Sequence, residues 1–275
     1  MICFPNAKIN IGLTIIEKRP DNFHNLETLF YPIPLTDILE IIEKNNDNGG
    51  KVELKVTGTD ISCDPESNLC VKAYRLLDRD YGIPPVQIML HKVIPMGAGL
   101  GGGSSDGAFT LTLLNKTFNL NISNERLKAY AARLGSDCAF FVENEPAFGV
   151  QKGEVLIPSE VDLSHYFLVL VKPNVFVGTA EAYAGITPAK PELSLQEYTK
   201  WRIEKWKDFI VNDFEKSIFS KHPEIPRVKN LLYENGAVYA SMSGSGSSVY
   251  GLFKEETNLR ELFPDCFYFE GKLGG

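Results

Sequence analysis

The chain has 275 residues, of which 44% are hydrophobic and 23% are charged, and this composition excludes wholesale disorder. Its formal net charge is -7 with Lys and Arg spread along the sequence, which argues against a partner that is nucleic acid or a membrane surface. An anionic ligand therefore needs a local site. The length predicts two domains, which we expect at residues 1–152 and 153–275, divided at a polar turn near residues 149–154.

The cysteines and the N-terminus indicate the compartment. The five cysteines are odd in number, widely spaced and without a C-x-x-C pair, which favours neither a disulfide framework nor a zinc site: Cys3, Cys63, Cys70, Cys138 and Cys266. The start MICFPNAKIN has no basic leader, and no apolar run approaches the roughly eighteen residues of a membrane-spanning helix. We expect a cytoplasmic protein, whose oligomeric state the sequence leaves undetermined.

The first elements are predicted to be strands. Apolar and polar residues alternate over residues 7–18, which predicts a strand with Lys8 and Asn10 on one face, one pleat apart. A loop follows at residues 20–25. The segments 37–43 and 51–56 flank a cluster of turn residues at 45–50, and we expect them to pair as a hairpin.

Helices and one more strand complete the first half. An amphipathic helix is predicted from a capping candidate at Ser67-Asn68 to Gly82, and a strand over residues 85–94. Further helices are expected at residues 104–115 and 123–135, the second ending on Gly135. A glycine-rich segment separates the strand from the helix after it.

The second half mixes strands and helices. A buried strand is expected at residues 165–173 and a short helix capped by Thr179. A long helix over residues 194–219, anchored by Trp201, Trp206 and Phe209, is predicted to be broken by Pro223 and Pro226. Strands return at 237–253, and a last helix and strand finish the chain. The irregular alternation indicates the α+β class.

The glycine-rich segment PMGAGLGGGSSDGA, residues 95–108, carries the functional signal. Glycine loses much conformational entropy on ordering, so such a run indicates strained backbone angles or a close approach. Consecutive N–H groups that lead into a helix N-terminus form an array of donors suited to phosphate. A mobile surface loop is the alternative without function.

Other phosphate-binding loops fit the segment less well. Residues 97–102 satisfy the dinucleotide pattern G-x-G-x-x-G, which keeps a nicotinamide-dependent oxidoreductase open, but a helix occupies the place of the expected acidic residue. A P-loop needs a lysine after the glycines, and none follows. The H-R-D and D-F-G motifs of protein kinases are absent from the sequence.

Residues 95–108 resemble the phosphate-binding motif of the GHMP small-molecule kinases, the superfamily of galactokinase, homoserine kinase and mevalonate kinase. The segments AKINIGLTIIEKRPDNFHNLETLF, ARLGSDCAFFV and MSGSGSSVYG are similar to other parts of that family, in its order. The resemblance implies a two-domain fold, with a ribosomal-protein-S5-like α+β N-terminal domain and a ferredoxin-like α/β C-terminal domain. It also implies an active site in the interdomain cleft.

The extended form GLGGGSSDGA narrows the implied activity. The resemblance implies phosphorylation by ATP of the 2-hydroxyl of a methylerythritol that carries cytidine diphosphate, in the non-mevalonate route to isoprenoid precursors. Magnesium is expected with ATP, with help from Ser104 or Asp137 but without an identified set of ligands. Another GHMP kinase acting on a different alcohol, and a nucleotide-binding module without activity, remain alternatives.

The resemblance also implies roles for individual residues. Asp137 would take the proton of the acceptor alcohol, while Lys8, a mobile positive charge, would keep Asp137 ionised. The glycine-rich segment would bind the ATP phosphates, and a second glycine-serine turn would cover them from the other domain. Three residues that match the family only loosely would contact adenine. The implied ATP-binding residues are Pro95, Met96, Gly97, Ala98, Gly99, Leu100, Gly101, Gly102, Gly103, Ser104, Ser105, Ser243, Gly244, Asn68, Leu69 and Lys92.

The acceptor would be bound by polar and aromatic side chains. Asn10 suits substrate hydroxyls, and cytosine would meet aromatic and polar groups, with the implied set Phe23, His24, Thr179 and Tyr183. The sequence departs from the family where Phe23 replaces a tyrosine and Asn22 a glycine. The proline after Thr179 is missing, and Ala139 stands for a proline, which we expect to alter the loop after Asp137.

Overall fold

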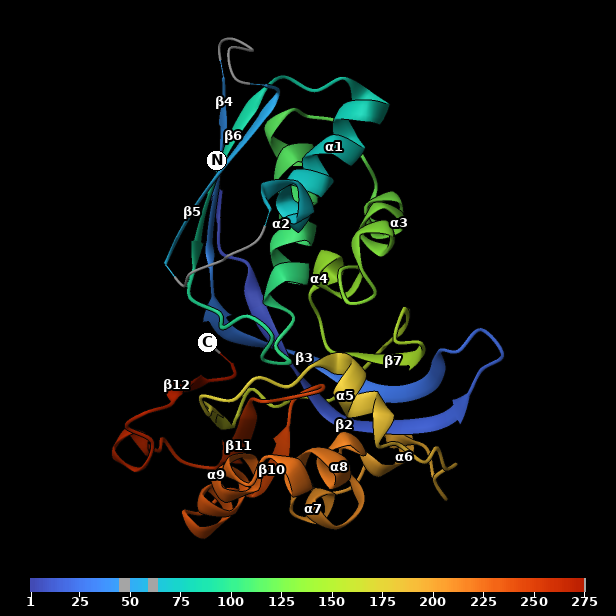
Figure 1. Ribbon diagram of the computed structural model, residues 1–275, viewed down its shortest axis with the longest axis vertical. Coiled ribbons are helices and arrows are strands. Elements are labelled where there is room, and N and C mark those ends of the chain that lie inside the picture. The colour runs from blue at the N-terminus through green and yellow to red at the C-terminus, as the bar shows by residue number, and fades with distance from the viewer. Residues whose placement is uncertain (45–49, 59–63, 275) are drawn as a thin grey trace. The chain divides into compact units, whose positions relative to one another are not determined.

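The computed structural model describes residues 1–44, 50–58 and 64–274, and these form two compact units of mixed helices and strands (Figure 1). The first unit comprises Met1–Ala7, Leu35–Met96 and Gly101–Glu145, and the second comprises Lys8–Pro34, Gly97–Leu100 and Pro146–Gly275. The predicted α+β class is confirmed. Because the units interleave along the chain, they do not test a single boundary after residue 152, which stays a prediction.

The sheet of the first unit corrects the predicted hairpin. Its order is β1-β4-β6-β5, with β1 at Ile2–Cys3, β4 at Ile38–Glu43, β5 at Val52–Gly58 and β6 at Val86–Lys92. Strand β6 lies between β4, to which it is antiparallel, and β5, to which it is parallel. A helix connects β5 to β6, as a parallel pair requires, and this crossover separates β5 from β4. The predicted turn lies largely outside the described residues, at 45–49.

The helices of this unit lie on one face of that sheet (Figure 1), and they are α1 at Leu69–Tyr81, α2 at Gly102–Thr117, α3 at Asn124–Leu134 and α4 at Phe140–Glu143. Asn68 caps α1 by accepting the Cys70 N–H, and Gly82 ends it with a φ of 60°. Ser123 caps α3 in the same way. The predicted helices are confirmed, with α2 longer than expected because it begins inside the glycine-rich segment.

The second unit contains two sheets. One has the order β2-β3-β7-β8, with β2 at Asn6–Lys18, β3 at His24–Thr36, β7 at Ala147–Gln151 and β8 at Val155–Pro158. The other is antiparallel with the order β10-β11-β9-β12, with β9 at Phe167–Lys172, β10 at Tyr239–Met242, β11 at Val249–Phe253 and β12 at Phe267–Lys272. Apolar side chains of β9, β11, α8 (Phe214–Lys221) and α9 (Glu224–Glu234) form its core.

The predicted long helix over residues 194–219 is wrong. The structure has α6 at Leu195–Tyr198, a 3-10 turn at Ile203–Lys205, α7 at Trp206–Phe209, and then α8. Between α7 and α8 the chain is extended, and Asn212 forms a β-bridge with Leu13 of β2. Trp206 is buried as predicted, whereas the side chains of Trp201 and Phe209 are 40% and 46% exposed.

The structure also corrects three smaller predictions about helices. Pro226 does not break a helix: it lies in the first turn of α9, where a missing N–H leaves no hydrogen bond unmade. Thr179 is the first residue of α5 (Thr179–Ala184), whose cap is Gly178. The last predicted helix is a 3-10 turn at Arg260–Leu262.

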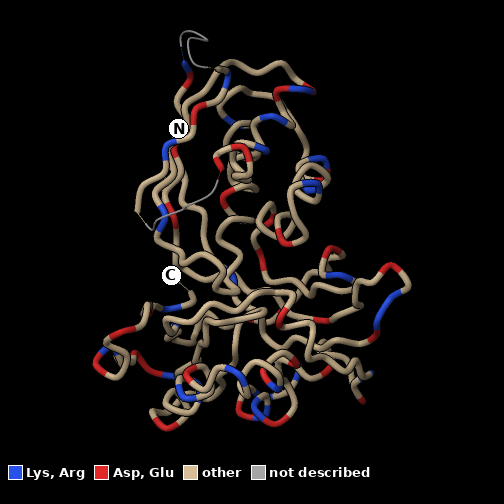
Figure 2. Tube along the Cα trace, viewed as in Figure 1, with Lys and Arg blue, Asp and Glu red and all other residues tan. Residues whose placement is uncertain are grey.

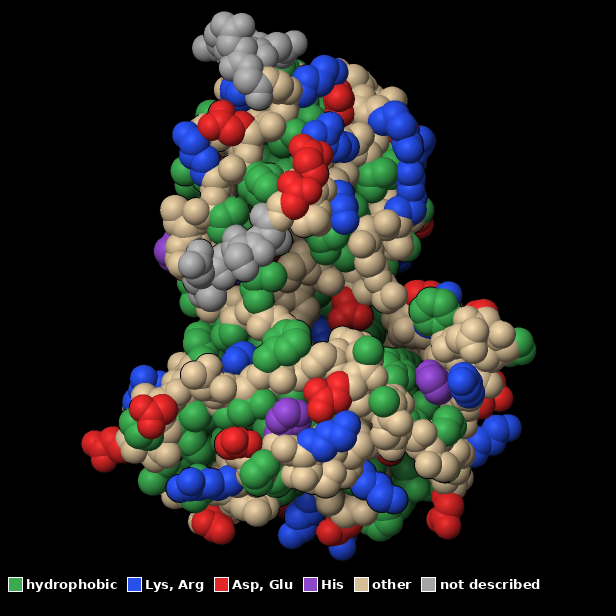
Figure 3. Space-filling model, in the orientation of Figure 1, with side chains coloured by type: hydrophobic (Ala, Val, Ile, Leu, Met, Phe, Trp, Pro, Cys, Tyr) green, Lys and Arg blue, Asp and Glu red, His purple; other side chains and the backbone are tan. Residues whose placement is uncertain are grey.

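Charges of both signs are interspersed along the traces of both units (Figure 2) and on the visible faces (Figure 3). No helix in the described part of the chain combines the length and apolar character needed to cross a membrane. Cys3, Cys70, Cys138 and Cys266 are free thiols, and Cys63 lies outside the described residues.

Candidate active site

The glycine-rich segment connects β6 to α2, in the predicted order of strand, glycines and helix. Gly97, Gly99 and Gly101 have φ angles of 60°, 76° and 71°, the left-handed region that favours glycine. A Cβ on Gly99 would lie 2.0 Å from the Ser243 carbonyl oxygen, and one on Gly97 would lie 2.7 Å from the Phe176 ring. Both the backbone angles and the close approach of neighbours therefore require glycine here.

The backbone carbonyls of residues 98–100 all accept hydrogen bonds from other parts of the second unit. Ala98 O accepts the Ser248 N–H at 3.3 Å, and Leu100 O accepts the Lys8 N–H at 2.9 Å. Between them, Gly99 O accepts the Ser243 hydroxyl at 2.8 Å and the Lys8 ammonium at 3.0 Å. Since the C=O and N–H of a trans peptide point in opposite directions, the next N–H after each carbonyl points away from these partners. The three N–H groups concerned are those of Gly99, Leu100 and Gly101, which we call the nest because successive N–H groups on one side of a backbone suit an anion.

Lys8 and Asn10 share one face of β2, as predicted. The Lys8 ammonium donates to Asn10 Oδ1 at 2.5 Å and lies 5.5 Å from the centre of the Phe30 ring. Lys8 is only 3% exposed, so the predicted mobile charge is instead fixed beside Gly99. Asn10 is equally buried and donates to Thr28 Oγ1, and its predicted contact with substrate stays a prediction.

The second glycine-serine turn meets the first within the second unit. Ser243 Oγ accepts the Asn10 N–H at 3.1 Å while it donates to Gly99 O. Gly244 has a φ of 54°, and a Cβ there would lie 3.2 Å from Asn10 Oδ1 and 3.3 Å from Gly99 O. The structure therefore brings together Lys8, Asn10, residues 97–100 and Ser243-Gly244.

The residues before Gly97 and after Leu100 in the glycine-rich segment belong to the first unit. Pro95 is half-buried and Met96 is exposed, and both precede the glycines. Ser104 and Ser105 lie in the first turn of α2, where the helix dipole favours an anion. Within the described residues, the buried Ser105 hydroxyl has no hydrogen-bond partner. Gly102 and Gly103 begin α2.

A buried ion cluster lies under that first turn. The Lys92 ammonium binds carboxylate oxygens of Asp37 and Asp106, and all three side chains are buried. Asp37 also accepts the Val93 and Ile94 N–H groups, at 2.6 and 2.9 Å. Burial raises the pKa of Asp106 to about 7, against the opposing charge of Lys92. The cluster fixes the backbone that leads into the glycines, and the predicted adenine contact of Lys92 stays a prediction.

Asp137 lies half-buried in the turn between α3 and α4. Both Asp137 and the Ser104 hydroxyl interact with Cys138, whose pKa burial raises to about 11, so that it remains a thiol. Ala139 has a φ of -62°, an angle that proline also adopts, so its replacement of a proline does not by itself require a different loop. The predicted pairing of Lys8 with Asp137 stays a prediction.

The predicted cytidine residues lie in the second unit. The rings of His24 and Tyr183 stack with centroids 5.0 Å apart and an interplanar angle of 23°. Phe23 is 58% exposed, with the Lys152 ammonium 5.0 Å from its ring centre. Asn22 has a φ of 65°, in the left-handed region that favours glycine, the residue that the motif resemblance implies at this position. Thr179 is exposed at the start of α5.

Asn68 and Leu69, which are predicted to contact adenine, are the N-cap and the first residue of α1. Asn68 Oδ1 accepts the Cys70 N–H at 2.9 Å, and a Cβ on Gly107 would lie 2.9 Å from Leu69 Cβ. Leu69 thus packs closely against α2. Contact of these residues with adenine stays a prediction.

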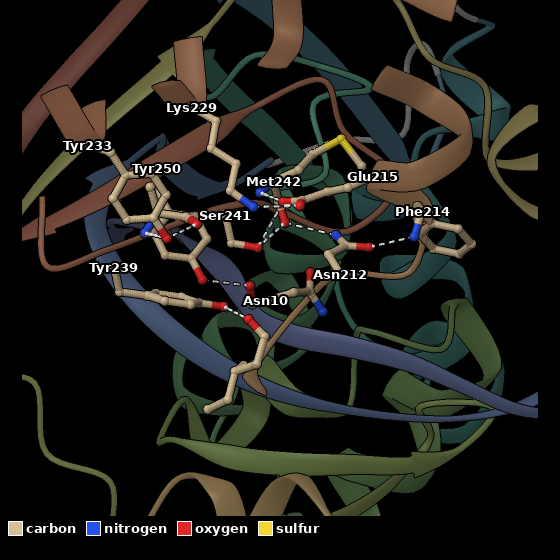
Figure 4. A network of polar contacts seen from close by, with 12 residues as sticks. Asn10, Asn212, Phe214, Glu215, Lys229, Tyr233, Tyr239, Ser241, Met242 and Tyr250 are labelled. Carbon is tan, nitrogen blue, oxygen red and sulfur yellow. Dashed lines mark hydrogen bonds and ion pairs between the residues drawn. The ribbon is translucent and has the colours of Figure 1, made fainter. Parts of the chain in front are cut away.

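Sequence reasoning missed two residues near the nest. Phe176, 72% exposed, lies against Gly97, and no local pattern distinguishes it from other loop aromatics. Asn212 is buried, and its side chain donates to the carbonyls of Met242, a contact drawn in Figure 4, and of Gly244. Asn212 falls within residues 194–219, for which the sequence predicts one long helix, and its pairing with Leu13 has no local signal.

No group of three or more His, Cys, Asp or Glu side chains among the described residues is arranged to hold a metal ion. Ser104 and Asp137, both beside Cys138, offer the hydroxyl and carboxylate oxygens that magnesium prefers. Two such donors fit an ion that takes its remaining ligands from phosphate and water.

Comparison with known proteins identifies the class. The GHMP kinases N terminal domain matches residues 68–145, and the GHMP kinases C terminal domain matches residues 202–264. The structure of Methanococcus jannaschii mevalonate kinase superposes with a TM-score of 0.73 at 15% identity, covering 98% of this chain and 97% of that one. The chain belongs to the GHMP kinases, in agreement with the motif resemblance.

Its nearer relatives share a more particular name. Proteins named 4-diphosphocytidyl-2-C-methyl-D-erythritol kinase are 53% identical in Bacteroides fragilis, over 99% of this chain and 100% of the relative, and 37% identical in Chlorobium phaeovibrioides, over 93% and 88%. A crystal structure of 4-(cytidine 5'-diphospho)-2C-methyl-D-erythritol kinase is 30% identical, with a TM-score of 0.83 and 98% of each chain covered.

Proposed function

We propose that the protein transfers the γ-phosphoryl group of ATP to the 2-hydroxyl of 4-diphosphocytidyl-2-C-methyl-D-erythritol, giving the 2-phosphate and ADP. This reaction belongs to the non-mevalonate route to isoprenoid precursors. The observation that carries the proposal is the identity of 37–53% with kinases of that name over nearly the whole chain. The nicotinamide-dependent alternative is not favoured, because these relatives are kinases. The free thiols support a reducing cytoplasm as the compartment.

The nest supplies the binding energy for the phosphates. Phosphoryl transfer depends mainly on alignment and on neutralising charge, with little covalent chemistry for the protein. The N–H groups of Gly99, Leu100 and Gly101, directed away from bound carbonyls, would donate to the β- and γ-phosphates. Lys8, fixed beside Gly99, adds a positive charge. Ser104 or Asp137 would hold the magnesium ion, which neutralises phosphate charge when bound.

Asp137 is the proposed general base. Its carboxylate would accept the proton of the 2-hydroxyl as that oxygen attacks the γ-phosphorus. On the acceptor side, the stacked rings of His24 and Tyr183 and the exposed Phe23 form apolar faces suited to cytosine. Phenylalanine at position 23 retains stacking but has no phenol to donate a hydrogen bond.

The test is an ADP-release assay with a panel of alcohols, run on the wild type and on Asp137→Ala. We expect turnover with 4-diphosphocytidyl-2-C-methyl-D-erythritol but not with mevalonate, homoserine or galactose. Asp137→Ala should reduce kcat by several orders of magnitude, since both base and alignment are lost. Equal turnover of mevalonate or galactose contradicts the proposed substrate, and full activity of the variant contradicts the base.

A further inference from the structure

Asn212 lies where an extended segment pairs with β2. The Leu13 N–H donates to Val211 O at 3.0 Å and the Asp213 N–H donates to Leu13 O at 2.9 Å, so the backbone around Asn212 is fixed to the strand that carries Lys8 and Asn10. The Asn212 side chain is 2% exposed and points toward β10 (Figure 4). Its position is therefore set by the sheet rather than by a helix.

The carboxamide of Asn212 makes three hydrogen bonds, and Figure 4 draws those with Met242 and Phe214. Its Nδ2 donates to Met242 O and to Gly244 O, both at 2.8 Å, and its Oδ1 accepts the Phe214 N–H at 3.0 Å. The two carbonyls flank Ser243. A carboxamide is suited to this task because it offers two N–H donors to neighbouring acceptors while its oxygen accepts.

Glu215 holds the same turn from the other side of Met242. Its Oε1 accepts the Met242 N–H at 2.8 Å and the Ser241 hydroxyl at 3.2 Å, and its Oε2 binds the Lys229 ammonium at 2.5 Å. Asn212 thus binds the C=O of Met242, and Glu215 binds its N–H. This leaves Ser243 little freedom at its N-terminal side, and the bond to Gly244 O restrains the other side.

Ser243 transmits this restraint to the nest. Its hydroxyl donates to Gly99 O at 2.8 Å and accepts the Asn10 N–H at 3.1 Å. The same carbonyl receives the Lys8 ammonium. The orientation of the Gly99–Leu100 peptide, and hence of the Leu100 N–H, depends on where Ser243 Oγ lies.

We propose that Asn212 is a positioning residue for nucleotide binding, which acts by fixing Ser243 and through it the Gly99 carbonyl. The inference rests on the proposed function, in which the N–H groups of residues 99–101 bind phosphate. A role in stability alone would affect both substrates equally. A positioning role weakens the binding of ATP more than that of the acceptor. The proposed acceptor residues His24 and Tyr183 lie on β3 and α5, and Asn212 is linked to them through Phe214, whose ring packs edge-on against Tyr183.

The experiment compares Asn212→Ala with Tyr239→Phe. Tyr239 is a matched control because its hydroxyl donates to Ile210 O at 3.1 Å, a buried hydrogen bond to the same segment with no bond to residues 242–244. Calorimetric titration measures the Kd of ATP and of the acceptor for each folded protein, and steady-state kinetics gives the two KM values and kcat.

We expect Asn212→Ala to raise the Kd and KM of ATP at least tenfold and those of the acceptor less than twofold. Tyr239→Phe should lower the unfolding temperature comparably and change neither affinity more than twofold. Combining Asn212→Ala with Ser243→Ala should add little to the loss of ATP affinity caused by Ser243→Ala alone, because both act through one carbonyl.

Unchanged ATP affinity in Asn212→Ala, or equal losses for both substrates, overturns the inference. If the alanine variant does not fold, Asn212→Asp decides in its place by the same criteria: it keeps the acceptor for the Phe214 N–H but turns an oxygen toward two carbonyls. If the wild type binds no ATP, the proposed function fails first, which is a distinguishable result.

Discussion

At the scale of single residues, the charge of Lys8 is placed beside the backbone that the phosphates are proposed to approach. Its ammonium contacts Gly99 O, Asn10 Oδ1 and the face of the Phe30 ring. Attraction between a buried ammonium and a polyphosphate is screened far less than at the surface, so the charge should matter for transfer as well as for binding.

Removing this charge tests its role. Lys8→Met keeps most of the side-chain volume, and we expect kcat/KM for ATP to fall about 100-fold or more, equivalent to about 2.7 kcal/mol of transition-state stabilisation. Lys18→Met, at the exposed end of the same strand, is the control and should retain wild-type kinetics. Steady-state kinetics of both variants gives the answer, and similar values for the two would contradict a role for the Lys8 charge.

Asp106 provides a second test at this scale, through pH. Burial raises its pKa to about 7 from an ordinary value of 3.8, so the native state binds a proton more tightly than the unfolded chain does. The free energy of unfolding should therefore fall as pH rises from about 4 to about 7, by up to about 1.4 kcal/mol per unit from this group. The groups that face it are Lys92 and Asp37, with the thiols of Cys3 and Cys70 nearby.

Urea unfolding at pH 5 and pH 8 measures this dependence. Asp106→Asn mimics the protonated carboxyl and should lose less stability between the two values than the wild type does. Equal losses in both proteins would mean that Asp106 does not titrate between these pH values.

At the scale of elements, the geometry of the nest depends on two things. The sequence predicts the glycines, but it does not predict the hydrogen bonds that other elements make to their carbonyls. Local signals sufficed for β2, α1, β6, α2 and α3, because periodicity and caps such as Asn68 and Ser123 are properties of a few neighbouring residues. Pairing is not local: β6 separates β4 from β5, and Asn212 pairs with Leu13 across the sequence. The hydrogen bonds from Ser243 and Lys8 to Gly99 depend on such long-range pairing.

Adding a single methyl group at Gly99 should abolish the binding of ATP by the nest. Gly99→Ala places a Cβ 2.0 Å from Ser243 O at a φ of 76°, so the turn and the nest cannot keep their present geometry. We expect ATP affinity to fall at least 100-fold in a calorimetric titration. Gly236→Ala is the control, since its φ of 96° is similarly strained but a Cβ there meets nothing within 4 Å. Wild-type ATP binding by Gly99→Ala would show that the nest does not hold the nucleotide.

At the scale of the whole molecule, the motif resemblance and the full-length relatives agree on a GHMP kinase. The sequence could not predict how the glycine-rich segment is shared, with residues 97–100 in one compact unit and residues 101–105 in the other. ATP that binds through the N–H groups of residues 99–101 would bind the native state and not the unfolded chain, so its binding should stabilise the fold.

A thermal unfolding series measures that stabilisation. At a concentration of 100 times its Kd, ATP should add about 2.7 kcal/mol to the stability of the native state and raise the unfolding temperature accordingly. NAD(H) at the same concentrations should have no effect. A shift with NAD(H) and none with ATP would reverse the choice between kinase and oxidoreductase.

The most direct measurement is a crystal structure with a non-hydrolysable ATP analogue and 4-diphosphocytidyl-2-C-methyl-D-erythritol. We predict β- and γ-phosphate oxygens within hydrogen-bond distance of the Gly99, Leu100 and Gly101 N–H groups, and the acceptor 2-hydroxyl within reach of the Asp137 carboxylate. Phosphates bound elsewhere, or an Asp137 remote from the acceptor, would contradict the account.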